Sequence, residues 1–179
     1  DMLARRNAVH LENLLQLTPN VNIAGGSSRA RFYQVRGIGE RSQFVEPLNP
    51  SIGLLVDDID FSGLGTAATL YDIEQVEVLR GPQGTLHGAN ALAGLINLRS
   101  AAPEEDFAAR LNATYGNYDR RELGASITGP LVDDRLLFRV AAFRHQSDGF
   151  IRNAFLERDD TNARDETLPG LRLAAGGDP

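Results

Sequence analysis

Several residue types are missing from this chain, and each absence removes a class of site. The chain has no cysteine, which excludes disulfide frameworks and thiolate metal centres. All 18 of its basic residues are arginine, so the lysine of a phosphate-binding P-loop is unavailable. No apolar run approaches the roughly 18 residues that a membrane-spanning helix needs. Any insertion into a membrane would therefore have to use strands.

The overall charge also narrows the choice of partners. The net charge is -6 and the arginines are spread along the 179 residues, so no basic patch is segregated for phosphate contacts. This argues against a nucleic-acid partner. A hydrophobic content of 42% is ordinary for a folded chain. Composition therefore permits one domain, or a domain followed by part of another.

The stretch Asp72–Leu98 carries the densest pattern in the sequence. Two β-rich runs, Val76–Leu79 and Leu95–Leu98, flank fifteen residues rich in glycine and alanine. This order predicts a strand, a Gly-Pro turn, a short helix and a second strand. The residues expected to shape the turn are Gly81, Pro82, Gly84, Gly88 and Gly94. The alternative, a glycine-rich cradle for an anion, is disfavoured because both the P-loop lysine and the dinucleotide fingerprint are missing.

The residues before this stretch predict a small α+β unit. Leu11, Leu14 and Leu15 fall on one helical face. The other expected elements are strands at Phe32–Arg36 and Ile52–Val56, a long loop at Ile38–Pro50 and a helical turn at Leu70–Ile73. Asp57, Asp58 and Asp60 crowd the end of the second strand. They could indicate a Ca²⁺ site, but a hydrogen-bonded strand end is the favoured interpretation because the spacing is not that of an EF-hand.

After the turn Ala101–Asp106 the pattern changes to alternation of apolar and polar residues. The elements expected there are strands at Phe107–Tyr115, Glu122–Gly129 and Leu136–His145, a tight turn at Pro130–Arg135, a polar loop at Ser147–Glu166 and a fourth strand at Thr167–Ala174. Runs of about 9 to 11 alternating residues are typical of membrane-spanning strands. A water-soluble antiparallel sheet would show the same alternation, so the pattern alone leaves both open.

The run IEQVEVLRGPQGTLHGANALAGLINL, residues 73–98, resembles the end of the plug domain of TonB-dependent outer-membrane receptors. Three earlier segments match the family in the same order, namely LENLLQLTPNV from Leu11 to Val21, Val35–Gly37, and LLVDDI from Leu54 to Ile59. The resemblance covers at least residues 11–100.

The resemblance implies an α+β plug, a small mixed sheet with short helices, followed by antiparallel strands of an incomplete transmembrane β-barrel. It places the plug at residues 1–103 and the first three to four barrel strands at residues 104–179, out of about 22 strands in a complete receptor. The implied location is the outer membrane of a Gram-negative bacterium. The implied partners are TonB, outer-membrane lipid and a scarce ligand, most often a ferric siderophore, with haem, cobalamin or a saccharide as alternatives.

The same resemblance implies roles for particular side chains. The ligand-binding residues expected on the outer plug loops are Arg29, Arg31, Arg41, Gln43, Phe44 and Phe61. Guanidinium groups suit carboxylate-bearing or phosphate-bearing ligands, and aromatic rings can stack on a flat one. Arg36 and Arg80 match plug arginines that lock the plug to glutamates of the barrel wall. For Arg80, a cap on the following turn is the alternative.

Two other functional classes were weighed against energised uptake. A soluble anion-binding enzyme would need a catalytic set, and His10, His87 and His145 fall in unrelated segments without a nucleophile motif. The prediction is therefore no enzyme, no catalytic or metal-binding residue and no cofactor. A passive adhesion surface without TonB coupling is the second alternative. Because the signal peptide, TonB box and aromatic barrel end of the family are not seen, we expect a fragment of a receptor that cannot transport alone.

Overall fold

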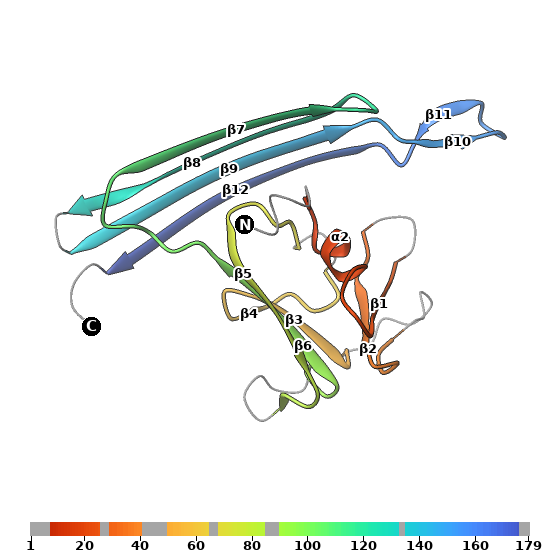
Figure 1. Ribbon diagram of the computed structural model, residues 1–179, viewed down its shortest axis with the longest axis horizontal. Coiled ribbons are helices and arrows are strands. Elements are labelled where there is room, and N and C mark those ends of the chain that lie inside the picture. The colour runs from red at the N-terminus through yellow and green to blue at the C-terminus, as the bar shows by residue number, and fades with distance from the viewer. Residues whose placement is uncertain are drawn as a thin grey trace. The chain divides into compact units, whose positions relative to one another are not determined.

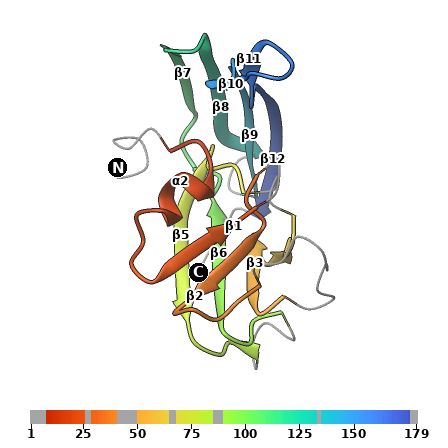
Figure 2. The same cartoon turned by 90° about the vertical axis from the view of Figure 1, so that its right-hand side faces the viewer.

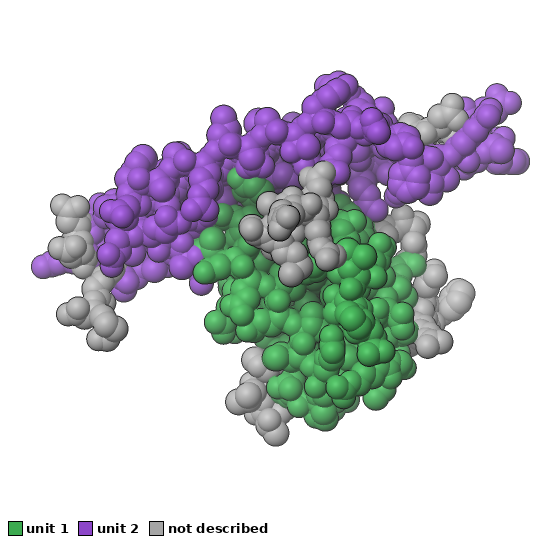
Figure 3. All heavy atoms as spheres, viewed as in Figure 1, with its two compact units in different colours: residues 1–101 green, residues 102–179 purple. Residues whose placement is uncertain are grey.

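The computed structural model describes residues 8–25, 29–40, 50–64, 68–84, 90–132 and 135–175, apart from the side chains of residues 158–160. The chain divides into two compact units, unit 1 at residues 1–101 and unit 2 at residues 102–179 (Figure 3). The predicted boundary after residue 103 stays a prediction. Among the described residues, no helix has the length and apolar character needed to cross a bilayer.

Unit 1 is built on a four-stranded sheet in the order β4-β3-β6-β5 (Figure 1). The strands are β3 (Ile52–Val56), β4 (Ile59–Asp60), β5 (Ile73–Arg80) and β6 (Gly94–Ser100). β3 runs parallel to β6, whereas the β3–β4 and β5–β6 pairs are antiparallel. The sheet is therefore mixed, and the predicted α+β plug fold is confirmed.

A short helix and a hairpin complete unit 1. Helix α2 (Leu11–Leu15) precedes the antiparallel strands β1 (Val21–Ala24) and β2 (Phe32–Val35), as Figure 2 shows. Leu11 and Leu15 are fully buried, as the helical spacing predicts. They join a core that also contains Val21, Tyr33, Val35, Ile52, Leu54, Ala68, Leu70, Ile96 and Leu98.

Two local predictions for unit 1 are wrong. β2 ends at Val35, and Arg36 and Gly37 have φ of 54° and 82°, so they form a tight turn instead of extending the strand. Val35 and Ile38 close this turn with hydrogen bonds in both directions, at 2.9 and 3.0 Å. The helical turn expected at Leu70–Ile73 is also absent, because Asp72 has φ of 60° and β5 begins at Ile73.

Unit 2 is a four-stranded antiparallel sheet in the order β12-β9-β8-β7. Its strands are β7 (Ala108–Gly116), β8 (Arg120–Val132), β9 (Leu136–Ser147) and β12 (Arg164–Ala175). β12 pairs with β9 along its whole length, from Arg164 opposite Ser147 to Ala175 opposite Leu136. The fold-class prediction of antiparallel strands after the plug is confirmed.

The ends of these strands differ from the predictions. Pro130 and Leu131 belong to β8 and not to a turn, because the strand continues to Val132. The segment predicted as a polar loop contains its own hairpin, β10 (Ile151–Asn153) paired with β11 (Arg158–Thr161), and β12 already begins at Arg164. The sequence did not indicate β10 and β11, because both strands are short and mostly polar and alternation over a few residues is a weak signal.

The two faces of the unit 2 sheet are the reverse of those of a water-soluble protein. Thr128 and Arg139 are each only 3% exposed, whereas Leu111 and Leu171 are 77% and 71% exposed. The pattern extends over several strands, with buried polar residues at Glu122, Ser126 and His145 and exposed apolar ones at Leu123, Ile127, Val140 and Leu173. On β8, β9 and β12 most apolar residues of the alternation thus lie on the more exposed face, with Phe143 of β9 as a buried exception, whereas β7 is exposed on both faces.

Candidate functional site

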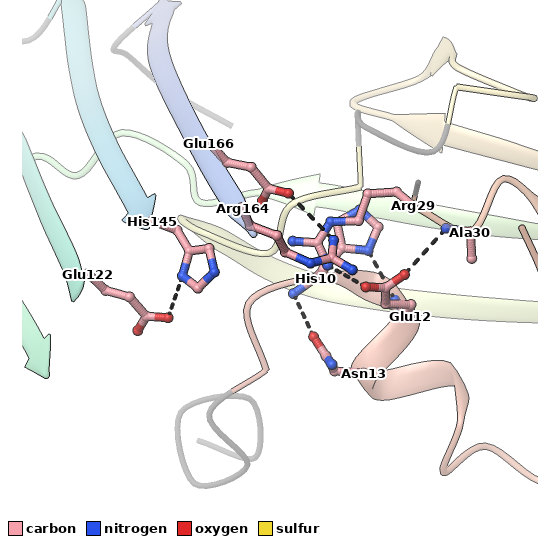
Figure 4. A network of polar contacts seen from close by, with 9 residues as sticks. All are labelled: His10, Glu12, Asn13, Arg29, Ala30, Glu122, His145, Arg164 and Glu166. Atoms are coloured by element: carbon pink, nitrogen blue, oxygen red, sulfur yellow. Dashed lines mark hydrogen bonds and ion pairs between the residues drawn. The ribbon is translucent and has the colours of Figure 1, made fainter. Parts of the chain in front are cut away.

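The most connected polar cluster of unit 1 lies where α2 begins. Glu12 in the first turn forms an ion pair with Arg29, and its other carboxylate oxygen accepts a hydrogen bond from the Ala30 backbone N–H at 3.3 Å (Figure 4). His10 is the N-cap: its Nδ1 accepts from the Glu12 N–H at 3.3 Å, while Asn13 Oδ1 accepts from the His10 N–H at 3.2 Å. The cluster fixes the residue 29–30 segment to the helix start.

Charge pairing governs the ionisation of this cluster. Burial of Glu12 alone raises its pKa, but the hydrogen bond and positive charge of Arg29, with the Ala30 N–H and His10, together hold the pKa below its usual value. The nearby Tyr33 is buried, and burial together with the Glu12 charge raises the pKa of its phenol. Glu12 is therefore a carboxylate at neutral pH, as its buried partner Arg29 requires.

The residues predicted to bind the ligand have separate partners in the structure. Arg29 pairs with Glu12, so a ligand would have to open that ion pair to reach it. Arg31 places its guanidinium 5.1 Å from the ring centre of Phe32, a cation-π contact. Phe61 is half-buried against the core of unit 1. Arg41, Gln43 and Phe44 lie outside the described residues, and the ligand-binding role of all six stays a prediction.

Arg36 and Arg80, the predicted lock residues, lie at the ends of strands β2 and β5 of unit 1. Arg36 is exposed in the turn after β2, where its backbone N–H donates to the Asn20 carbonyl at 2.9 Å. Arg80 is the last residue of β5, opposite Gly94 of β6, and is also exposed. Both guanidinium groups therefore project from unit 1 into its surroundings.

The Gly-Pro turn is closed by backbone pairing. The Gly81 N–H donates to the Ala93 carbonyl at 3.0 Å, and the Gln83 N–H donates to the Ala91 carbonyl at 2.8 Å, with Pro82 between them. Gly81 has φ of 110°, and a Cβ at Gly94 would come within 2.9 Å of the Leu79 carbonyl oxygen. Gly84 has open space around it. Gly88, His87 and most of the predicted short helix lie outside the described residues.

Two of the three aspartates that follow β3, Asp57 and Asp60, accept hydrogen bonds, in line with the favoured interpretation of the sequence. Asp57 accepts from the backbone N–H and hydroxyl of Ser100, at 2.9 and 2.6 Å. Asp60 accepts from the Ser62 N–H at 2.8 Å and from Asn90 Nδ2 at 2.6 Å. Burial raises the pKa of Asp60, but these bonds outweigh it and lower that pKa. No group of three or more metal-ligating side chains forms within the described ranges.

The buried polar face of unit 2 has its own ion pairs, which the sequence did not reveal. Glu122 on β8 accepts from Arg120 Nε at 2.7 Å and lies 2.9 Å from His145 Nδ1 on the neighbouring β9. Arg164 and Glu166 on β12 approach to 3.8 Å. The alternation placed Glu122 and His145 on predicted strands but could not show that their face is the buried one, and Arg164 and Glu166 were predicted to lie in a loop. Figure 4 shows Glu122 with His145, and Arg164 with Glu166.

A family model for the TonB-dependent receptor plug domain matches residues 1–95, which is more than half of the chain. The chain belongs to the TonB-dependent receptor family. Its relatives include the pesticin receptor of Yersinia pestis, 28% identical over 163 residues, which are 90% of this chain and 24% of the relative. The vitamin B12 transporter BtuB of Photobacterium profundum is 27% identical over 164 residues, 90% of this chain and 26% of the relative.

Solved structures of receptors extend the match beyond the plug. The ferric yersiniabactin uptake receptor FyuA from Yersinia pestis superposes with a TM-score of 0.84 at 25% identity, covering 98% of this chain and 27% of that one. The closed form of the ferric-catecholate import receptor Fiu from E. coli K12 gives a TM-score of 0.75 at 20% identity, covering 98% and 23%, and shows the fold alone. The chain spans about a quarter of the length of these relatives.

Family membership explains the reversed faces of unit 2. TonB-dependent receptors are outer-membrane proteins of Gram-negative bacteria, and the strands of such a barrel turn an apolar face to lipid and a polar face inward. The predicted location in the outer membrane is thereby confirmed. The matched relatives are named as receptors and transporters, which supports a role other than catalysis.

Proposed function

We propose that this chain is the plug and the first barrel strands of a receptor for energised uptake of an iron complex, most often a ferric siderophore. The observation that carries the proposal is the order of the two units: a plug of the TonB-dependent family is followed directly by strands whose polar face is buried and whose apolar face is exposed. This is the arrangement needed to hold a plug inside a membrane barrel.

The names of the relatives support the ligand class. Several of them are named for iron complexes, including the ferrioxamine B receptor of Salmonella typhimurium, 27% identical over 146 residues, and the ferric yersiniabactin receptor. The ligand residues proposed for this chain are Arg29, Arg31, Arg41, Gln43, Phe44 and Phe61. Arg31 and Phe61 lie on separate segments of unit 1, so a ligand that contacts both would span these segments.

Arg36 and Arg80 are the residues proposed to lock the plug to the barrel wall. The support is their exposure on unit 1, since an exposed guanidinium is available to a carboxylate of another part of the receptor. Enclosure of either one inside a barrel without a carboxylate partner would be costly. Each is therefore proposed to face an acidic side chain in the assembled receptor.

The complete reading frame that contains this chain provides the test. It would be expressed in a Gram-negative host that lacks its own siderophore receptors, with and without a functional TonB, and uptake of radioactive iron would be measured for hydroxamate, catecholate and mixed siderophores. We expect uptake of at least one complex, lost when TonB is removed. Uptake or adhesion that is independent of TonB would instead indicate a passive surface receptor. Absence of uptake for all the ferric complexes tested would reject the iron ligand.

A further inference from the structure

At the start of unit 2, where the chain leaves the plug, hydrogen bonds hold the segment around Glu104 to the neighbouring strands. The backbone N–H of Glu104 donates to the Thr128 hydroxyl on β8 at 2.8 Å. The same hydroxyl donates to the Phe138 carbonyl on β9 at 3.1 Å. Because Thr128 is buried, water does not compete effectively for these bonds. One hydroxyl thus connects the segment that leaves the plug with two neighbouring strands.

The Glu104 carboxylate makes a second connection. Its Oε1 lies 3.4 Å from Arg139 Nη1 and 3.4 Å from Arg110 Nη2. The Arg110 side chain is largely exposed, so that pair contributes little. The Arg139 side chain is buried, and a buried guanidinium is costly without acceptors. Glu104 itself is half-exposed, which makes the charge pair weaker than a fully buried one and leaves the Thr128 bond to fix the geometry.

We propose that Glu104, Thr128 and Arg139 form an anchor that stays closed during transport and fixes the first residues of unit 2, which follow the plug in the chain, to strands β8 and β9. This inference rests on the proposed function, in which the plug rearranges while the strands stay in the membrane. Force on the plug then reaches the wall through the segment around residue 104. The anchor marks the point in the chain at which the rearrangement of the plug ends. Its three residues are positioning residues and do not contact the ligand.

A disulfide across the anchor tests whether it opens. The complete receptor would carry Glu104→Cys and Thr128→Cys, the two residues that the hydrogen bond from the Glu104 N–H to the Thr128 hydroxyl brings together. Iron uptake per ligand-binding site would be compared in oxidised and reduced receptor, with each single cysteine variant as control. We expect the oxidised receptor to take up iron at least as fast as the reduced one, because the crosslink replaces the hydrogen bond that Thr128→Cys removes. Uptake by the oxidised receptor that falls tenfold below uptake by the reduced receptor would overturn the proposal.

Conservative variants test whether the anchor matters for the rate. Thr128→Val removes the shared hydroxyl at nearly constant volume, and Thr128→Ser restores it. Glu104→Gln removes the charge beside Arg139, and Glu105→Gln removes an exposed charge from the next residue as a matched control. We expect Thr128→Val and Glu104→Gln to lower the maximal uptake rate per binding site by about threefold or more at unchanged ligand affinity. Thr128→Ser and Glu105→Gln should behave as wild type.

The outcomes separate the anchor from the function on which it rests. Absence of TonB-dependent uptake by the wild-type receptor would reject the proposed function. Normal uptake by wild type together with normal rates for Thr128→Val and Glu104→Gln would reject the anchor alone. A defect that Thr128→Ser fails to rescue would also reject it, because loss of the hydroxyl would then not be the cause.

Discussion

Unit 1 and unit 2 contain the same apolar residue types, but unit 1 buries most of its leucines whereas unit 2 exposes them. In unit 1, leucines such as Leu11, Leu54 and Leu98 lie inside a core, and charged residues lie mainly outside. In unit 2, Leu111 and Leu171 are exposed while Arg139 and His145 are buried. Burial of apolar surface stabilises a protein in water, whereas a strand in lipid gains from apolar exposure. Which residues are buried, more than the alternation itself, therefore indicates whether a unit is built for water or for lipid.

The largest expected effect concerns the core of unit 1. Leu15 is fully buried at the end of α2, and Leu17 two residues later is 60% exposed. We expect Leu15→Ala to destabilise unit 1 by about 3–5 kcal/mol, through lost burial and an unfilled cavity, and Leu17→Ala by under about 0.5 kcal/mol. Hydrogen exchange of the plug segments in the purified receptor measures both. Equal protection in the two variants would show that the helix is not part of the core.

An exposed apolar residue should respond differently in the two units. Ile127 lies on the exposed face of β8, where an arginine in lipid costs about 2–4 kcal/mol near the midplane. The matched substitution Leu17→Arg places the same charge at an exposed site of unit 1. We expect Ile127→Arg to reduce the amount of folded receptor in the outer membrane, and Leu17→Arg to leave it unchanged. Heat-modified mobility of the barrel on gels reports the folded fraction. Tolerance of Ile127→Arg would contradict a lipid-facing sheet.

Removing one partner of the buried ion pair in unit 1 should destabilise the unit less than creating a cavity in its core. Glu12→Gln keeps the shape of the side chain but removes the negative charge beside Arg29, which we expect to destabilise unit 1 by about 2 kcal/mol. The hydrogen bond from the His10 N–H to Asn13 Oδ1 does not involve the Glu12 side chain, so the substitution should leave it in place. Hydrogen exchange of residues 29–35 should rise in the variant. Unchanged exchange there would show that the pair does not hold the segment.

The same pair predicts a pH dependence of unit 1. Because the folded state lowers the Glu12 pKa, its contribution is present above the pKa of an unfolded glutamate and is lost as the pH falls through the lower folded pKa. Asp60 adds a contribution of the same sign. We expect plug stability to fall between neutral and acidic pH, with a smaller fall in Glu12→Gln. A pH profile identical in wild type and variant would exclude Glu12 as a source.

The sequence predicted the elements with strong periodicity and missed features that depend on long-range contacts. The strand at Ile52–Val56 and the buried pair Leu11 and Leu15 match the structure, because each carries a clear apolar pattern. The turn at Arg36 and Gly37 was missed because a left-handed arginine leaves no mark in composition. The Glu12–Arg29 pair joins residues 17 positions apart, and no local pattern announces such a partner.

The anchor and the hairpin β10–β11 show the same limit within unit 2. Glu104 lies in an acidic turn that the sequence marks only as a junction, and its partners Thr128 and Arg139 lie on two later strands. The alternation placed Thr128 and Arg139 on their strands but gave no reason to connect them with the junction. Family resemblance, rather than periodicity, distinguished a membrane sheet from a water-soluble one.

The exposure of the unit 2 apolar face to lipid can be measured directly in the complete receptor. Spin labels would be placed one at a time at Ile127, Leu171 and Leu17, and their relaxation by oxygen, which enters lipid, would be compared with that by a water-soluble nickel complex. The account predicts that labels at Ile127 and Leu171 respond to oxygen and are shielded from nickel, while the label at Leu17 responds to nickel. Nickel access to Ile127 and Leu171 equal to that at Leu17 would contradict it.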